Sequence, residues 1–422
     1  MIEFDKTAYG DHLVQRTCRA VIAVLVALPV WLGASHGLVD FERNQALEAA
    51  LIGAAIIHLW TRPKWTAWLP ALLIGASGCI IYGIRHHGFG TFWVSTLGTC
   101  AAFAGVGSLL VLTVQLCIVT RPHRAYVRNT LIAAAAFPYF TFILAFALNL
   151  TTALRPKVYD LILYGFDETL QIHAGAWIGH VFAVSFPLRI AGILVYEYLP
   201  TAICLLLALQ RARPDRFSVD PMRLFISVGV VGAVLYSVLP ACGPIYVFGA
   251  RFPDHLPPVS GLAIQPLFLA GKPRNAMPSL HFACALLIVW NTAGLNRVWR
   301  ALAVVLMAMT FFATLGFGEH YFVDLVVAVP FAVAMQAACL ESSPWTSLER
   351  RTACYGSGAL TLVWMAALRF EWFSVSAPAI CWSAIAVTIL LSLWWKRGLN
   401  RGQIDLQQQV LPVRPVILAQ EP

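Results

Sequence analysis

The chain has 422 residues, of which 59% are hydrophobic and only 12% charged, and its mean hydropathy is +0.74. Because about a quarter of the residues of soluble domains are charged, this composition excludes an ordinary soluble protein and predicts a polytopic membrane protein. The formal net charge of +9 comes from basic residues scattered over short loops without a contiguous basic face, so we expect no nucleic acid partner.

Apolar runs that are long enough to cross a bilayer recur along the whole chain. We predict an all-α membrane helix bundle of about twelve transmembrane helices, each of about 20 residues. The first run follows the polar start Met1 to Arg19 and has no clear small-residue cleavage site, so we interpret it as a retained helix and not as a signal peptide. The predicted crossings are residues 20–39, 46–60, 67–84, 91–119, 130–150, 190–210, 222–243, 279–295, 298–318, 320–340, 356–373 and 377–395.

The pattern of runs and motifs divides the chain into four predicted segments. Residues 1–129 form an N-terminal membrane block of four helices, and residues 130–340 form a six-helix block that carries all the motifs described below. Residues 341–397 form a C-terminal membrane hairpin, and the polar, Gln-rich tail 398–422 is predicted to be disordered. We find no internal repeat, which disfavours a transporter built from two repeated halves.

The distribution of lysine and arginine over alternate loops predicts the orientation, because basic residues accumulate on the cytoplasmic side. One set of loops, which includes both termini, holds 20 of the 29 basic residues. The other set includes the loop from Gly243 to Pro278. We therefore expect an integral protein of the inner (plasma) membrane with cytoplasmic N and C termini and with this loop on the outer side.

Ten cysteines are scattered along the chain, none of them in a CxxC pair, and most lie inside apolar runs. Such cysteines predict neither a disulfide framework nor a thiolate metal site. We expect no metal and no cofactor.

Two short motifs place two histidines and a carboxylate at the ends of apolar helices. The first, GKPRNAMPSLH, ends at His281, and the second, GEHYFVD, contains His320 and Asp324. An imidazole can accept a phosphoryl group covalently, a carboxylate four residues further on lies on the same helix face, and a second imidazole can protonate the leaving oxygen. The motifs therefore predict a phosphoryl-transfer site in a membrane.

The position of each residue predicts its role. Asp324 would accept the proton of one ring nitrogen of His320, which leaves the other nitrogen free to attack phosphorus. His281 follows the expected N-cap Ser279 and would act as the general acid. Each residue also has a structural alternative, which is a buried pair joining helices for His320 and Asp324 and an interfacial histidine beside a helix cap for His281.

Basic and polar residues precede the predicted helix start. We predict that they bind the substrate phosphate near the positive end of the helix dipole, with the guanidinium of Arg274 as a bidentate clamp and the ammonium of Lys272 as a point charge. The alternative for the two basic residues is contact with anionic lipid head groups. The predicted phosphate-binding residues are Lys272, Arg274, Asn275 and Ser279.

PSLH followed by HYFVD resembles the second and third signatures of the type 2 phosphatidic acid phosphatase superfamily. The forms AMPSLH and HYFVD, with YSVLPACGPIY from Tyr236 to Tyr246, look like the branch that contains fungal inositol phosphorylceramide synthase and sphingomyelin synthase. The resemblance covers about residues 130–340. It implies a six-helix catalytic core, an outward-facing site without metal, and a phosphohistidine on His320, with Asp324 in support and His281 as the acid. It also implies a lipid phosphate substrate and a lipid or polyol acceptor.

The chain departs from the superfamily pattern in two places. Ala313 and Thr314 stand where phosphatase members carry Ser-Arg, and the Lys-x6-Arg-Pro signature is absent, although residues 155–157 (Arg-Pro-Lys) echo it in part. A phosphate monoester dianion would find fewer cations here, which favours transfer to an alcohol over hydrolysis. The candidate head-group pocket consists of Arg155, Lys157 and Tyr236.

The sequence therefore predicts a membrane lipid phosphotransferase, similar to an inositolphosphotransferase of sphingolipid metabolism. The first alternative is a lipid phosphate phosphatase, in which water replaces the acceptor alcohol. The second is a transporter or scramblase, because ionisable residues inside membranes also line proton paths and wet grooves. A scaffold that has lost catalysis is a further alternative.

Overall fold

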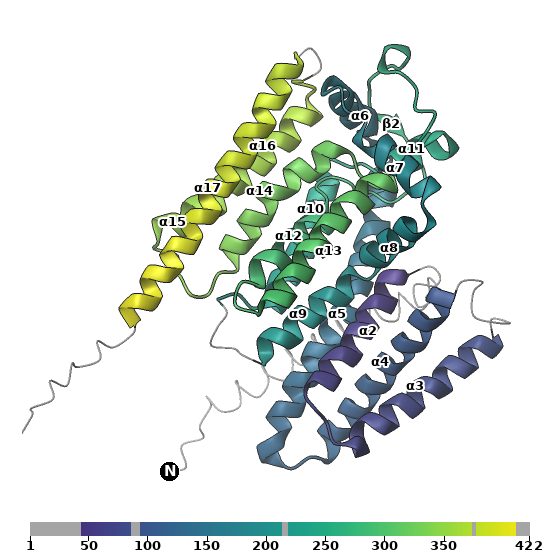
Figure 1. The fold of residues 1–422 in the computed structure, drawn as a ribbon, viewed down its shortest axis with the longest axis vertical. Coiled ribbons are helices and arrows are strands. Elements are labelled where there is room, and N and C mark those ends of the chain that lie inside the picture. Colours follow the sequence, from purple (N-terminus) through teal and green to yellow (C-terminus); the bar gives the residue numbers. More distant parts are fainter. Residues whose placement is uncertain (1–43, 86–92, 213–217, 374–376, 411–422) are drawn as a thin grey trace, which may run out of the picture. The chain divides into compact units, whose positions relative to one another are not determined.

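The computed structural model describes residues 44–85, 93–212, 218–373 and 377–410, and their regular structure is almost entirely helical. The chain forms two compact units, which can be followed by colour in Figure 1. Unit 1 consists of Met1–Leu154 and Glu197–Ala212, and unit 2 consists of Arg155–Tyr196 and Arg213–Pro422.

Unit 1 is a bundle in which small residues allow helices to approach closely. Helix α4 packs against α2, α3 and α5, and α2 also packs against α5 and α9. A Cβ atom added at Gly105 would lie only 2.0 Å from the carbonyl oxygen of Leu51, so this contact between α4 and α2 requires glycine. The helices are α2 (Gln45–Trp60), α3 (Trp65–Arg85), α4 (Trp93–Ile118), α5 (Arg121–Leu154) and α9 (Leu199–Arg211).

Unit 2 is built around α14 (Phe322–Ala338), in which 13 of the 17 residues are buried. A helix that is apolar on all sides must be covered on all sides, and α14 contacts α6, α10, α12, α16 and α17. The other helices of unit 2 are α6 (Asp160–Thr169), α7 (Ala174–Val184), α8 (Phe186–Glu197), α10 (Pro221–Val238), α11 (Pro244–Phe248), α12 (Leu280–Asn291), α13 (Arg297–Gly316), α15 (Leu348–Arg351), α16 (Ser357–Arg369) and α17 (Pro378–Val410), with short turns at Gly249–Arg251, Val259–Gly261 and Thr352–Gly356.

The long loop between α10 and α12 is tied to the chain before α6. Its strand β2 (Leu267–Phe268) pairs antiparallel with β1 (Lys157–Val158). The N–H of Tyr159 donates to the carbonyl of Pro240 over 2.9 Å, and the N–H of Ala276 donates to the carbonyl of Ala241 over 3.0 Å. These bonds hold the loop that contains the first motif beside the start of α6.

Among the described residues, six helices are long and apolar enough to cross a membrane: α3, α4, α5, α10, α13 and α17. Helices α7 and α8 pass the same test together, but the chain bends by 117° between them, as in a broken span or a re-entrant loop. The apolar helices α2, α9, α12 and α14 have only 10–17 residues. A helical membrane protein is therefore confirmed, whereas the count of about twelve crossings is not, and the predicted crossing 20–39 lies outside the described residues.

Several predicted boundaries differ from the structure. The predicted crossing 190–210 is interrupted at Tyr198, after which α9 begins with a proline in its first turn, where the missing N–H costs no hydrogen bond. Helix α17 continues to Val410, so the tail predicted from 398 is helical as far as that residue, and 411–422 lie outside the described residues. The predicted domain limits at 129 and 340 also differ from the two units, because α5 and α9 pack against α2 and because α16 and α17 pack against α14.

Candidate active site

The first motif ends at a capped helix start. Ser279 is the N-cap of α12, as the sequence predicts, and its fully buried hydroxyl oxygen accepts a hydrogen bond from the N–H of Phe282 over 3.4 Å. The N–H of Ser279 donates to the carbonyl oxygen of Asp324 over 3.2 Å. The backbones of the two motifs are therefore joined directly, and His281 lies in the first turn of α12.

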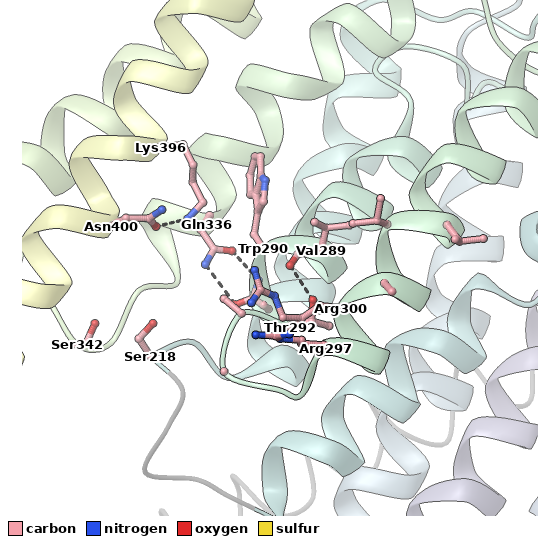
Figure 2. A pocket seen from close by; sticks show the side chains of 16 residues that line it. Ser218, Val289, Trp290, Thr292, Arg297, Arg300, Gln336, Ser342, Lys396 and Asn400 are labelled. Atoms are coloured by element: carbon pink, nitrogen blue, oxygen red, sulfur yellow. Dashed lines mark hydrogen bonds between the residues drawn. The ribbon is translucent and has the colours of Figure 1, made fainter.

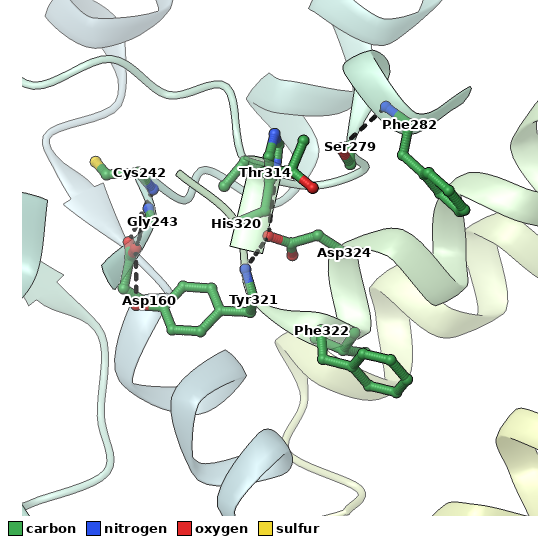
Figure 3. A network of polar contacts seen from close by, with 12 residues as sticks. Asp160, Cys242, Gly243, Ser279, Phe282, Thr314, His320, Tyr321, Phe322 and Asp324 are labelled. Carbon is green, nitrogen blue, oxygen red and sulfur yellow. Dashed lines mark hydrogen bonds and ion pairs between the residues drawn. The ribbon is translucent and has the colours of Figure 1, made fainter. Parts of the chain in front are cut away.

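His320 lies in the turn between α13 and α14, with 1% of its surface exposed (Figure 3). Its Nδ1 atom is 2.9 Å from the carbonyl oxygen of Ala276 and 3.4 Å from Oδ2 of Asp324. The carbonyl oxygen is nearer, and it can only accept, so we assign the Nδ1 proton to the bond with Ala276. The sequence predicts Asp324 as the acceptor of this proton, but the structure gives that place to a backbone carbonyl of the first motif.

This hydrogen bond selects the tautomer of His320. With the proton on Nδ1, the Nε2 atom carries a lone pair, and within the described residues this buried atom has no hydrogen-bond partner. Burial lowers the pKa of His320 to about 4, so the ring is neutral at pH 7. A neutral imidazole with an unengaged Nε2 is the form that attacks phosphorus.

Asp324 connects the two motifs in a different way from the one predicted. Its Oδ2 accepts a hydrogen bond from the N–H of Tyr321 over 2.8 Å, because a carboxylate at the third position of a helix reaches back to the backbone of its N-cap. The other oxygen, Oδ1, is buried and has no hydrogen-bond partner among the described residues. The carboxyl group remains within 3.4 Å of His320 Nδ1. Burial raises the pKa of Asp324 well above its usual value, and positive charge that develops on the ring favours its ionised form, which offsets that charge.

His281 faces His320 at the same site. The centroids of the two imidazole rings are 6.3 Å apart, with an angle of 63° between the ring planes. On its other side His281 stacks on Tyr196 of α8, at a centroid distance of 3.9 Å and an interplanar angle of 13°. The ring is partly exposed, whereas His320 is buried. The structure thus brings both predicted histidines together, and an aromatic side chain of α8 fixes the orientation of one of them.

Two acidic residues of α6, which were not among the predicted site residues, hold the second motif in place. Asp160 is fully buried, and its Oδ1 accepts hydrogen bonds from the N–H of Gly243 over 2.8 Å and from the hydroxyl of Tyr321 over 3.2 Å (Figure 3). It also accepts from the N–H of Cys242 over 3.0 Å. Burial raises the pKa of Asp160 to about 6, although these hydrogen bonds oppose the shift.

Asp167 lies about two turns after Asp160 on α6 and caps the start of α14. Its two carboxylate oxygens accept hydrogen bonds from the N–H groups of Phe322, over 2.6 Å, and Val323, over 3.1 Å. A carboxylate at this place satisfies two N–H groups that a helix start leaves without partners. Two carboxylates at i and i+7 in an otherwise apolar stretch were the sequence signal for this role, because such groups are buried only when they are hydrogen-bonded.

Arg274 is fully buried and makes five hydrogen bonds within the protein. Its Nε donates to the carbonyl of Arg155 over 3.0 Å, and its other donors reach the carbonyls of Pro156, Leu269 and Lys272 and the sulfur of Cys242. A guanidinium has five donors, so all of them are occupied. Arg274 therefore fixes the loop to the two residues before β1, and the clamp on a phosphate stays a prediction that would require some of these bonds to open.

The remaining predicted binding residues differ in exposure. Asn275 carries a buried Oδ1 atom without a hydrogen-bond partner among the described residues, and it precedes the carbonyl that orients His320. Lys272 is exposed, with its ammonium 6.0 Å from the ring of Tyr246. Of the candidate head-group residues, Arg155 and Lys157 are exposed, whereas Tyr236 is buried in α10 with 4% exposure.

The position at which phosphatases carry arginine has a structural role in this chain. Thr314 is fully buried, its hydroxyl donates to the carbonyl of Phe311 over 3.0 Å, and its own carbonyl accepts from the N–H of His320 over 3.2 Å. Beside His320 in the sequence, Glu319 accepts a hydrogen bond from the hydroxyl of Tyr246 over 3.1 Å, and burial raises the pKa of Glu319 to about 7. An acid that titrates near neutrality therefore lies next to His320.

Comparison with known proteins agrees with this geometry. Residues 161–338, a little under half of the chain, match the family model described as the PAP2 superfamily. The match contains all the site residues from Asp167 to Asp324 and supports the superfamily that the two motifs resemble, and with it a membrane enzyme of phosphoryl transfer acting on lipid phosphates. The searches of curated proteins and of solved structures found no match.

Proposed function

We propose that the protein is a membrane phosphotransferase that moves a phosphorylated head group from one lipid to an alcohol through a phosphohistidine on His320. In the first half-reaction, Nε2 of His320 attacks the phosphorus of a lipid phosphodiester or diphosphate. The bond from phosphorus to the leaving oxygen breaks, and this oxygen takes a proton from the imidazolium of His281. Burial and the neighbouring His320 lower the pKa of His281 to about 3, so the ring must gain its proton when substrate binds, and a phosphate bound nearby favours this because an adjacent anion stabilises the cation.

The second half-reaction reverses the roles. The hydroxyl oxygen of the acceptor attacks the phosphorus of phospho-His320 and releases its proton to His281. The bond from phosphorus to nitrogen breaks, and its electron pair returns to Nε2, so both histidines regain their initial states. Throughout the cycle the Nδ1 proton stays on the bond to Ala276, and the Asp324 carboxylate offsets the charge of the phosphorylated ring.

One observation carries this proposal: the Nδ1 atom of His320 is bound to a carbonyl at 2.9 Å, while its buried Nε2 atom has no hydrogen-bond partner among the described residues and lies on a ring 6.3 Å from that of His281. A pair that only joined helices would engage both nitrogens, since buried polar atoms are nearly always hydrogen-bonded. An unengaged nitrogen that carries a lone pair, on a ring beside a second histidine, instead suits a nucleophile and its acid.

The shortage of cations available to a substrate at this site favours transfer from a diester over hydrolysis of a monoester. The guanidinium of Arg274 is saturated by the loop, and Thr314 occupies the place of the phosphatase arginine. A diester carries one negative charge where a monoester dianion carries two, so it needs fewer cations. We therefore propose a diester donor in preference to a diphosphate, and an alcohol acceptor, which is a lipid or a polyol such as an inositol.

The test is transfer of labelled phosphate by the purified protein. The protein is mixed with a lipid extract and a ³²P-labelled donor lipid, and label should appear in a second lipid. A rapid quench without acid should retain label on the wild-type protein but not on the His320→Ala variant. Release of free phosphate alone would make the protein a phosphatase. Movement of intact lipid across vesicles without any change of its chemistry, unaffected by His320→Ala, would overturn the proposal in favour of a scramblase.

We further propose that the site faces the outer side of the membrane, on the basis of the basic residues in the alternate loops. Intact cells should then convert a short-chain donor lipid that cannot cross the membrane. Conversion only after permeabilisation would reverse the proposed orientation.

A further inference from the structure

A cavity lined by both apolar and polar side chains lies at the opposite end of α12 from His281 (Figure 2). It has a volume of about 970 Å³ and is bounded by the end of α12, the start of α13, and parts of α14 and α17. Asn291 lies ten positions after His281 on α12, which at about 1.5 Å per residue places the cavity roughly 15 Å from the histidine site. No histidine or cysteine is among its lining residues in the described part of the chain, so it is not a second copy of that site.

The charged groups in the wall of this cavity have one sign. Arg297 and Arg300 project from the first turn of α13, and Lys396 projects from α17. The described residues that line the cavity include no aspartate or glutamate. The carboxylate nearest in sequence, Glu341, pairs with Arg223 at 3.5 Å. Three cations around one cavity create a local field that attracts an anion.

Two of the three cations are not engaged in ion pairs, and the third is held in place. Arg297 and Arg300 are exposed, and no ion pair to either occurs in the described structure. The ammonium of Lys396 donates to Oδ1 of Asn400 over 2.6 Å and lies 5.5 Å from the ring centre of Trp290. An amide and an indole orient this ammonium without neutralising it.

The remaining surface of the cavity has both a polar floor and an apolar wall. The floor is a buried amide pair, in which Asn291 donates to Oε1 of Gln336 over 2.8 Å. The wall includes Val304 and Val305 of α13, a helix that is long and apolar enough to cross the membrane, and these side chains are 48% and 58% exposed. Cations and exposed valines line the same cavity, with Val304 one turn after Arg300 on α13, and this lining matches a molecule with an anionic head and a hydrocarbon chain.

We propose that this cavity binds the phosphate-bearing head group of an anionic membrane lipid, with Arg297, Arg300 and Lys396 around the phosphate and an acyl chain along Val304 and Val305. Guanidinium groups suit a phosphate because they can donate two hydrogen bonds to it at once. A soluble phosphate would use the cations alone and would gain nothing from the valines. The proposal is independent of the chemistry assigned to the histidines.

The test is lipid binding by the purified full-length protein in a neutral detergent, in the His320→Ala background so that no lipid is consumed. Phosphatidylglycerol should raise the unfolding temperature and appear as a bound adduct in native mass spectrometry, because a ligand that binds only the folded state stabilises it. Phosphatidylcholine with the same chains should do neither. Inorganic phosphate at equal concentration should also have no effect, and an equal effect of phosphate would overturn the lipid as the ligand.

Neutralising the cavity should remove the binding. We expect roughly tenfold weaker binding of phosphatidylglycerol for R297Q/R300Q and about a hundredfold for the triple variant with K396Q. R351Q/R401Q is the matched control, since both residues are basic, exposed and outside the cavity, and it should bind as before. The double variant changes only exposed side chains, so it tests the site even if the triple variant does not fold. Unchanged binding by the double variant would overturn the proposal.

Discussion

The two ends of α12 hold their polar groups in opposite ways. At the His281 end, the ionisable side chain of His320 is buried and its orientation is fixed by a backbone carbonyl, so one nitrogen is directed and the other left unengaged. At the Asn291 end, Arg297 and Arg300 are exposed and can adjust to what they meet. A covalent step depends on one fixed atom, whereas recognition of a charged head group depends on the summed field of several charges.

The largest effect is expected from removing the nucleophile. His320→Ala should lower kcat by roughly 10⁴-fold or more and abolish the labelled phosphoenzyme, since loss of a nucleophile removes the covalent route. The measurement is turnover of labelled lipid with quench of the intermediate. His255→Ala, an exposed histidine of the long loop, is the control and should be normal. Turnover in His320→Ala equal to that of wild type would end the covalent mechanism.

The next effect tests whether His281 acts as the acid. His281→Ala should lower kcat by about 10² to 10⁴-fold with a natural leaving alcohol, which is the usual contribution of a general acid. With a p-nitrophenyl leaving group, which departs without protonation, formation of the phosphoenzyme should recover most of this loss. An equal loss with both leaving groups would show that His281 positions the substrate and does not donate the proton.

Replacing Arg274, near the histidine end of α12, distinguishes a structural role of this side chain from a role in binding phosphate. Its five hydrogen bonds predict that Arg274→Ala lowers the free energy of unfolding by about 3 kcal/mol, as expected when several buried polar partners lose their donor. Thermal unfolding measures this, with the exposed Arg251→Ala as control. The clamp predicted from the sequence would instead leave unfolding unchanged and weaken transition-state binding by about 3 to 4 kcal/mol.

The smallest expected effect is on the pH dependence of stability and comes from Glu319. Burial raises the pKa of Glu319 from 4.5 to about 7. Between these values the folded protein holds a proton that the unfolded chain has lost, so the free energy of unfolding should fall as pH rises from about 4.5 to 7. Glu319→Gln should reduce this fall by on the order of 1 kcal/mol. Unfolding temperatures at pH 5 and 8 measure it, with Glu371→Gln as control, and parallel curves for wild type and Glu319→Gln would contradict the assignment.

The motifs allowed the sequence to predict part of the site. A serine before an apolar run predicts the N-cap of α12, and the structure shows Ser279 in that role. The spacing of four residues brought Asp324 within 3.4 Å of His320, yet it could not show that a carbonyl lies nearer. Backbone carbonyls have no sequence signature, because every residue supplies one. For the same reason the sequence could not show that the donors of Arg274 are all occupied, since four of its five partners are carbonyl oxygens.

Hydropathy and residue type are local properties, so the sequence alone was enough to predict a helical membrane protein and the candidate side chains of its site. The atoms that those side chains contact follow from the packing of the helices. It brought Asp160 and Asp167 of α6 to the second motif across more than 150 residues of chain, and it placed Tyr196 against His281. The physical reason is that a buried polar group must find a partner wherever the packed helices offer one, and that choice depends on the whole arrangement of unit 2.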